Sequence, residues 1–390
     1  MVIIIHKGNA LDVMLKYVCS GNINFIIGSG ASFPAIKTLG NLEEDITSLV
    51  AQHSKEPMGN FKEEIAKKIN GFIMDSIIPN KMLMRLIKPS KNNKFRYRLV
   101  RVEKRFRLNE MSEGIINYLI NIKRALVNYR KFIRIIYELL LMRANDKYPK
   151  KINIFTTNYD LFFEAACELL DIPYNEGGNG YIRRTFSTKN FQKKIIRLSD
   201  YYSYSYEEPI INILKLHGSV NWSIGKSDIE IKNAVVLRDV DTEHINERGH
   251  ITNLNVPIIL PTKQKFVRTL LEHIYYDMSR FYANELEREQ SVLFCFGFSF
   301  ADEHIRSITK RALGNPSLTL IIFPFSIKDE IDLYHLFKSY NNVKIVRLEK
   351  SSDEIDVRFV DKPIDADKRI NIDFTAFISL FEELKAKAKN

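Results

Sequence analysis

The sequence SGNINFIIGSGAS, residues 20–32, is the stretch that decides the fold. An apolar run of strand length ends at Gly28, and the glycine turn Gly28-Ser29-Gly30 follows it directly. Glycines at this point let the backbone turn tightly and approach a pyrophosphate, whose charge is met by N–H groups at the start of the next helix. The dinucleotide-binding fingerprint has a third glycine where this chain has Phe33, so the turn alone also fits a purely structural role.

Apolar runs of the same kind recur along the chain, separated by segments with helical spacing. The runs lie at 152–156, 211–216, 257–260, 292–297 and 318–323. Buried parallel strands have continuous apolar sequences of this kind, because helices cover both faces of their sheet. We therefore predict an α/β fold, a Rossmann-like parallel sheet with helices on both faces, formed by residues 1–54 and 150–390.

Further elements follow from the same patterns. The spacing predicts helices at 9–20, 161–170, 302–313, 328–340 and 374–389, and a helix that continues from the glycine turn through residue 52. Asp302 is expected to cap its helix or lie in its first turn. Residues 343–348 and 354–360 are predicted strands, and 177–208, which is rich in Gly, Tyr and Ser, is predicted to be a long loop.

Residues 55–149 are predicted to be a mostly helical insertion, because long amphipathic stretches such as 111–141 replace the short apolar runs. Within it lies what we call the basic segment, residues 81–107. It holds eleven Lys or Arg residues against the single acid Glu103, a local net charge of +10 in a chain whose total is +11. Such a run is typical of a solvated surface, of a surface that meets an acidic partner, or of a nucleic-acid site.

Cysteine usage and the amino terminus bear on metal binding and location. Cys19, Cys167 and Cys295 are far apart, and no pair has the spacing of a zinc site. A reducing, cytoplasmic setting is the expectation. The first apolar run is short and follows no basic region, so we expect neither an export signal nor a membrane span.

Polar motifs follow three other predicted strands, where open α/β sheets bind ligands. In TTNYD, residues 156–160, the amide of Asn158 and the carboxylate of Asp160 can hold a ribose and a carboxamide, or can cap the next helix. In LHGS, residues 216–219, His217 can act as a general base or can be structural. GFSF, residues 297–300, offers backbone donors and a hydroxyl group.

Taken together and in this order, GSGAS, TTNYD, LHGS and GFSF resemble the NAD-binding core of sirtuins, and more closely the sirtuin-like domains of bacterial antiphage NADases. The similarity covers roughly residues 20–35, 150–225 and 290–325. It implies that NAD+ is the substrate. The binding residues it implies are Gly28, Ser29, Gly30 and Ala31 for the pyrophosphate and adenosine, Gly297 and Ser299 for the adenosine ribose, Thr157, Asn158 and Asp160 around the nicotinamide ribose, and His217 at that ribose's hydroxyl groups.

Departures from the sirtuins that remove acyl groups narrow the implied activity. Those sirtuins carry a four-cysteine zinc module, a Gln where this chain has Thr157, and a Phe-Arg pair where it has residues 33–37. The resemblance therefore implies an NAD+ glycohydrolase without zinc and not a protein deacylase. The products of such a glycohydrolase are nicotinamide and either ADP-ribose or a cyclic isomer. Asn158 and His217 are the expected catalytic residues: Asn158 positions the water or the ribose, and His217 orients or deprotonates the water. Asp160 would help to hold the carboxamide.

The resemblance also implies a biological setting, antiphage defence by depletion of NAD+ in an abortive infection. It implies a homo-oligomer and a separate sensor such as a HerA-like ATPase ring, with the basic segment and the helix at 374–389 as contact surfaces. The alternative is a nucleic-acid-binding or nuclease subunit of a defence complex that binds NAD or ADP-ribose as a regulator. Turnover of NAD+ separates the two.

Overall fold

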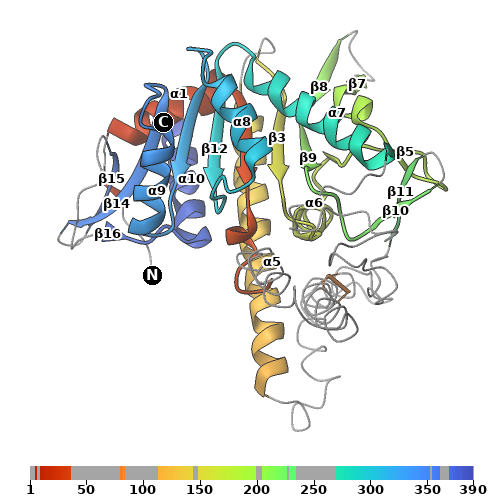
Figure 1. Cartoon of the computed structure of the whole chain (residues 1–390), viewed down its shortest axis with the longest axis horizontal. Coiled ribbons are helices and arrows are strands. Elements are labelled where there is room, and N and C mark those ends of the chain that lie inside the picture. The colour runs from red at the N-terminus through yellow and green to blue at the C-terminus, as the bar shows by residue number, and fades with distance from the viewer. Residues whose placement is uncertain are drawn as a thin grey trace, which may run out of the picture.

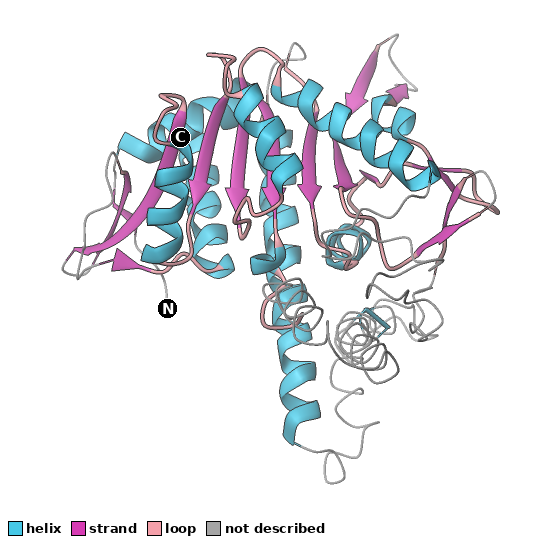
Figure 2. Ribbon diagram, in the orientation of Figure 1, coloured by secondary structure: helices cyan, strands magenta, loops and turns pink. Residues whose placement is uncertain are grey.

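The fold is seen in a computed structural model that describes residues 5–6, 9–36, 80–81, 83, 113–143, 148–198, 204–225, 228–233, 269–351, 354–360 and 369–389. A large sheet with helices on both faces dominates these residues (Figures 1 and 2). The run expected at 257–260, most of the helix expected through residue 52 and most of the basic segment lie outside the described residues.

The central sheet accounts for most of the strands, and the helices lie on either side of it. The sheet contains β1 (Ile5–His6), β2 (Asn22–Ile27), β3 (Lys151–Thr156), β4 (Tyr174–Asn175), β9 (Ile210–Lys215), β12 (Ser291–Phe296), β13 (Thr319–Phe323), β14 (Val343–Ser351), β15 (Glu354–Phe359) and β16 (Arg369–Ile370). The described helices are α1 (Asn9–Ser20), η1 (Ser29–Ala31), α5 (Glu113–Leu141), α6 (Phe162–Leu170), η3 (Thr188–Gln192), α7 (Thr269–Leu286), α8 (Glu303–Ala312), α9 (Ile327–Phe337) and α10 (Phe374–Lys389).

The strand order confirms the predicted Rossmann-like fold. The parallel strands lie side by side as β9-β3-β2-β12-β13-β14, and in chain order they are the third, second, first, fourth, fifth and sixth. This is the order of the doubly wound dinucleotide-binding sheet. The direction of strand addition reverses between β2 and β12, so the carboxyl ends of these two strands form the topological switch point, where such sheets bind ligands.

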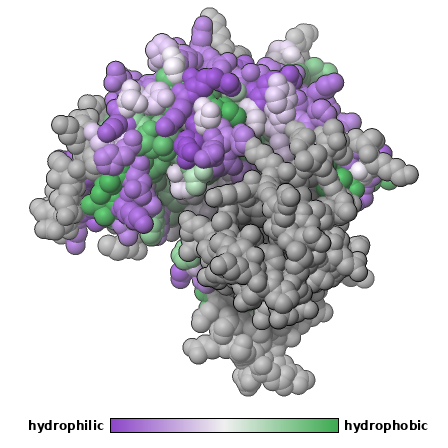
Figure 3. Space-filling model, in the orientation of Figure 1, coloured by the Kyte–Doolittle hydropathy of each residue, from purple (hydrophilic) through white to green (hydrophobic). Residues whose placement is uncertain are grey.

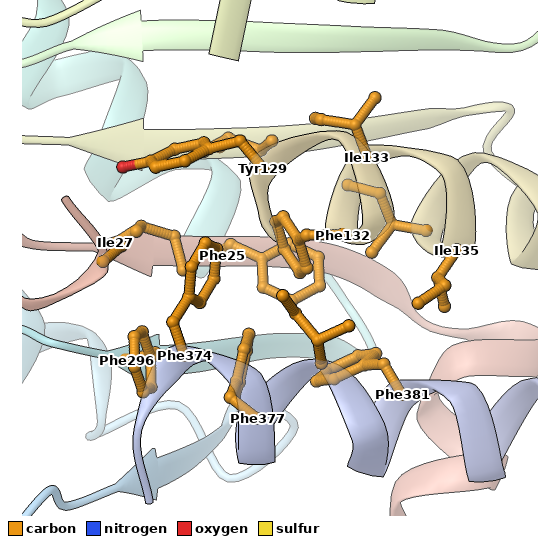
Figure 4. Close-up of a cluster of buried hydrophobic side chains, with 14 of the residues drawn as sticks. Phe25, Ile27, Tyr129, Phe132, Ile133, Ile135, Phe296, Phe374, Phe377 and Phe381 are labelled. Atoms are coloured by element: carbon orange, nitrogen blue, oxygen red, sulfur yellow. The ribbon is translucent and has the colours of Figure 1, made fainter. Parts of the chain in front are cut away.

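Two apolar cores explain why the strands read as continuous apolar runs. Every residue of β9 and β12 is buried, because helices cover both faces of the sheet. On one face α1, α5, α6 and α10 pack, with Phe25 of β2 in ring contact with Phe132 of α5 and Phe381 of α10 (Figure 4). On the other face α7, α8 and α9 surround a second core.

Helix α5 lies within the predicted insertion, and its carboxyl half belongs to the first core. Tyr129, Phe132 and Ile133 are buried there among residues of the sheet and of α10. Because the described residues include only Asn80, Lys81 and Leu83 between residues 37 and 112, the division of the chain at residues 55 and 149 stays a prediction.

The expectation of a long loop at 177–208 is wrong. This segment contains β5 (Gly178–Asn179), β6 (Thr185–Phe186), η3, and the hairpin of β7 (Ile195–Leu198) and β8 (Ser205–Glu208). Strands β5 and β6 join β10 (Trp222–Ile224) and β11 (Ile229–Ile231) in a small antiparallel sheet. Strands this short carry no readable alternation. What fixes them is distant packing, as of Phe186 on Trp222, whose ring centroids are 4.5 Å apart.

The described surface is mainly polar over α7 and α8 in the view of Figure 3, with apolar atoms gathered toward α9. Among the described residues no helix combines the length and apolarity that a membrane span requires.

Candidate functional site

The four sequence motifs leave the sheet from a single row of paired residues. Phe296 of β12 pairs with Ile27 of β2, Ile27 pairs with Thr156 of β3, and Thr156 pairs with Lys215 of β9. Four loops therefore leave neighbouring strands at the same level of the sheet: the glycine turn, the TTNYD loop, the LHGS loop and the GFSF loop. Two of these strands, β2 and β12, flank the topological switch point.

The two glycine loops at the switch point touch through their backbones. A Cβ atom on Gly28 would lie 2.2 Å from the carbonyl oxygen of Gly297, and one on Gly30 would lie 2.8 Å from the Gly297 Cα. Gly297 itself has φ +62°, a conformation that favours glycine. Glycine at positions 28 and 297 is thus required for the close approach of β2 and β12.

The backbone N–H groups of the turn are engaged within the protein. Gly28 N–H donates to Phe296 O at 3.0 Å, Gly30 N–H donates to Gly297 O at 3.2 Å, and Ala31 N–H donates to Gly28 O at 3.2 Å. The sequence led us to expect free N–H groups for a pyrophosphate at a helix start, and at these three positions that expectation is wrong. The hydroxyl groups of Ser29, which is partly buried, and Ser299, which is exposed, lie at the same edge of the sheet.

Asn158 is buried and held by the glycine turn. Its Nδ2 atom donates to Gly28 O at 3.1 Å and to Ser32 Oγ at 3.2 Å. Its backbone N–H donates to Thr156 Oγ1 at 3.0 Å, and that hydroxyl donates to Ile27 O at 2.7 Å. Anchoring Nδ2 fixes the plane of the amide, so Oδ1 is the atom with which Asn158 can accept a hydrogen bond from a ligand.

Asp160 is buried beside Asn158 and shares its network. Its Oδ2 accepts a hydrogen bond from Ser32 Oγ at 2.6 Å, and its Oδ1 accepts from Phe162 N–H at 3.2 Å at the start of α6. The hydroxyl of Tyr129 on α5 lies 2.7 Å from Ser32 Oγ. Burial raises the pKa of Asp160, while the charge of Lys215 and the Ser32 hydrogen bond act in the opposite direction. Both carboxylate oxygens therefore have protein partners. The N-cap of α6 is Leu161 and not Thr157, Asn158 or Asp160, although Asp160 accepts from the first N–H group of that helix.

His217 lies at the end of β9, opposite the start of α8. Its Nε2 atom is 2.9 Å from Oδ2 of Asp302, and the two side chains are 16% and 23% exposed. Gly218 follows with φ +89°, a value that a residue with a side chain adopts only under strain. Asp302 is the N-cap of α8, as the sequence predicted, because its Oδ1 accepts from the N–H groups of His304 and Ile305.

The structure thus gathers the predicted residues at one edge but in two groups. Asn158 binds Gly28 O of the glycine turn and Asp160 binds Ser32 just after it, on the side of α5, while His217 binds Asp302 on the side of α8. The backbone of Tyr159 connects their loops, because its carbonyl accepts from Val220 N–H at 3.2 Å. Thr157, which directly precedes Asn158, is partly buried.

Several residues of this site were not nominated from the sequence. Lys215 donates from Nζ to the carbonyl oxygen of Asp160 and pairs with Glu164 at 3.1 Å. Lys215 lies in the apolar run INILKL and Glu164 in FFEAACELL. A charged residue inside an apolar run could have identified each of them, because charged residues are rarely buried unless they are paired. Tyr129 gives no local signal, since it reaches Ser32 across 97 residues.

Metal ligation has no support among the described residues. They contain no group of three or more His, Cys, Asp or Glu side chains that is arranged to hold a metal ion.

These features define an α/β protein whose Rossmann-like sheet carries a polar site at its topological switch point. Comparison with family models adds that residues 152–343 match the model described as SIR2-like domain. The match supports a sirtuin-like family and suggests an NAD-dependent activity, and its range includes Asn158, His217 and Gly297. No curated protein matches the chain.

Proposed function

We propose that this chain is an NAD+ glycohydrolase, which hydrolyses the bond between nicotinamide and ribose. The observation that carries the proposal is the common level of the four motifs: they leave β12, β2, β3 and β9 at paired residues, around the switch point of the sheet. The match to a SIR2-like domain, residues 152–343, covers three of these four strands, β3, β9 and β12. A dinucleotide is the class of ligand that such a switch point accepts.

We place the adenosine and pyrophosphate of NAD+ along residues 28–31 and 297–299. Because the N–H groups of Gly28, Gly30 and Ala31 are engaged, we assign the polar contacts there to the hydroxyl groups of Ser29 and Ser299. The nicotinamide riboside would extend toward Thr157, Asn158 and His217. The carboxamide contact assigned to Asp160 remains part of the proposal, although both of its oxygens already accept hydrogen bonds.

The chemistry requires that the site hold the ribose and deliver water. The glycosidic bond breaks through an oxocarbenium-like state, and its electron pair leaves with nicotinamide, which becomes neutral. Water adds to the anomeric carbon and gives up a proton, so that NAD+ and water yield nicotinamide, ADP-ribose and H+. We assign Asn158 Oδ1 to the ribose or the water, and His217 to orienting the water or accepting its proton. Attack by an internal nucleophile in place of water would give a cyclic isomer.

The biological setting is the finer part of the proposal. We propose antiphage defence in the cytoplasm by NAD+ depletion, within a homo-oligomer and with a HerA-like ATPase ring as partner; the motif resemblance supports this. Helix α10 packs its apolar face into the core, so a partner contact there would use its exposed side, which includes Thr375, Glu382 and Lys389. The basic segment is the second proposed contact surface.

Two substitutions test the assignment in folded protein. We expect Asn158→Ala and His217→Ala each to lower kcat for NAD+ loss by roughly 10² to 10⁴-fold, because each removes a positioned polar group. The matched controls are Asn179→Ala and His335→Ala, two exposed residues, which should keep wild-type turnover. Full activity of both site variants would refute the residue assignment, and tight NAD+ binding without turnover by the wild type would favour a binding module.

A further inference from the structure

The carboxylate of Asp302 contacts both the first turn of a helix and a histidine. Oδ1 accepts hydrogen bonds from His304 N–H and Ile305 N–H, each at 2.9 Å, at the first turn of α8. Oδ2 lies 2.9 Å from Nε2 of His217. The backbone donors and the helix dipole favour the charged form of this carboxylate, and they also fix which oxygen faces the histidine.

The contact with Asp302 determines which nitrogen of a neutral His217 imidazole carries the hydrogen. An ionised carboxylate only accepts hydrogen bonds, so the nitrogen that faces it must carry the hydrogen. Nε2 is that nitrogen, and a neutral imidazole has a single N–H group. Nδ1 of His217 therefore keeps the lone pair with which a base accepts a proton.

The loop that presents Asp302 is held in an unusual backbone conformation. Phe300 has φ +57° although it is not glycine, and a bulky residue in that region is an outlier. Its ring is fully buried between Phe298 and Phe337, with centroids 4.9 Å away in each case. Strain of this kind persists only where surrounding packing enforces it, and it is frequent at functional sites.

We propose that Asp302 is a positioning residue that sets the tautomer of His217 and so presents Nδ1 as the proton acceptor of the site. The catalytic consequence rests on the proposed function, whereas the tautomer does not. The competing role is capping of α8 alone, which needs Oδ1 and not Oδ2.

Asp302→Asn separates the two roles. The asparagine keeps a carbonyl oxygen for the N–H groups of His304 and Ile305, so the cap survives. The atom that faces Nε2 becomes an NH₂ group, which donates, so His217 must accept at Nε2 and carry its hydrogen on Nδ1. Asp302→Ser keeps a capping hydroxyl but leaves Nε2 without either kind of partner.

Nitrogen-15 NMR of histidine-labelled full chain reads the tautomer directly, in the alkaline range where imidazole is neutral. The His217 signals are those that disappear in His217→Gln. We expect Nε2–H in the wild type and Nδ1–H in Asp302→Asn. The control is Asp329→Asn, in the capping box of α9, which should leave the His217 tautomer and the turnover unchanged.

Turnover supplies the second readout. We expect Asp302→Asn to lower kcat for NAD+ by roughly 10² to 10⁴-fold with KM changed less than about threefold, because the tautomer is wrong while binding is kept. Asp302→Ser should lose less activity, since its imidazole samples both tautomers. Three results would each overturn the proposal. They are a hydrogen on Nδ1 of His217 in the wild type, the same tautomer in Asp302→Asn as in the wild type, and a changed tautomer in Asp302→Asn with wild-type kcat. Absence of turnover in the wild type contradicts the proposed function alone, and the NMR result then decides the tautomer.

Discussion

Lys215 and Glu164 form an ion pair inside the protein, next to Asp160. Lys215 Nζ is 3.1 Å from Glu164 Oε1, and the side chains are only 4% and 7% exposed. Within the described residues neither oxygen of Glu164 accepts a hydrogen bond of good geometry. Burial raises the pKa of Glu164 to about 7, and the attraction of Lys215 offsets this only in part.

This raised pKa predicts a pH-dependent stability. The folded protein binds the Glu164 proton more tightly than the unfolded chain, so the free energy of unfolding falls as pH rises from the ordinary value of 4.5 to about 7. Glutamine cannot ionise. We therefore expect urea denaturation to show that Glu164→Gln gains stability relative to wild type across this window, by on the order of 3 kcal/mol. A difference that stays constant with pH would contradict this, and Glu168→Gln, an exposed position of α6, is the control.

Individual side chains were predictable from the sequence only in part. The positions of Asn158 and His217 at strand ends followed from the apolar runs before them, and both lie at the predicted edge. Their partners did not follow. Ser32 and Tyr129 are brought to Asn158 and Asp160 by tertiary packing, and the contact of Asp302 with His217 spans 85 residues.

At the scale of elements, the site depends on the contact between the ends of β2 and β12. The Gly28 and Gly297 backbones fill the space between these strand ends, and Gly28 N–H bonds to Phe296 O. In the sequence the Gly28 segment was visible as a turn, and GFSF as a polar motif at the end of a strand. Their mutual contact was not, because nothing local indicates that β12 is the neighbour of β2.

Gly28→Ala tests that contact. The added methyl would meet the carbonyl oxygen of Gly297 at 2.2 Å, and backbone cannot move aside as a flexible side chain can. We expect a loss of roughly 3 kcal/mol or more in the free energy of unfolding, above the usual range for overpacking, together with loss of NAD+ turnover. Gly314→Ala is the control, because its methyl meets only Arg311 O, at 3.2 Å. Wild-type stability of Gly28→Ala in thermal or urea unfolding would show that the two loops are not in this contact.

The strands with continuous apolar runs and the helices with amphipathic spacing were the predictable elements, and α1, α6, α8, α9 and α10 lie where they were expected. The sequence led to β2, β3, β9, β12 and β13, and each lies within two residues of its predicted run. The small sheet and the hairpin between 177 and 208 escaped prediction, since two- to four-residue strands are set by partners such as Trp222 and not by a pattern of their own.

At the scale of the whole molecule, an aromatic core lies between the sheet, α5 and α10, and it connects helix α10 with the site. Phe377 of α10 stacks on Phe296, the last residue of β12, with ring centroids 4.6 Å apart. Tyr129, whose hydroxyl reaches Ser32, meets Phe374 of α10 edge to face in the same core. The carboxyl-terminal helix is therefore part of the scaffold that supports the site.

Phe377→Ala should destabilise the entire fold. Truncation of a fully buried ring leaves a cavity and removes apolar contacts, which typically costs about 3 to 5 kcal/mol. The same change at Phe325, which is 53% exposed, should cost far less. Equal melting temperatures for the two variants would mean that α10 does not pack on the sheet in solution.

The central claim is that this molecule breaks NAD+, and product identification tests it most directly. Purified chain would be incubated with NAD+ as wild type and as His217→Ala, each alone and with the protein encoded by the neighbouring gene. We predict that the wild type releases nicotinamide with an equal amount of ADP-ribose or a cyclic isomer, and that His217→Ala does not. Intact NAD+ in every mixture, with NAD+ still bound by the wild type, would contradict the claim and indicate a binding protein.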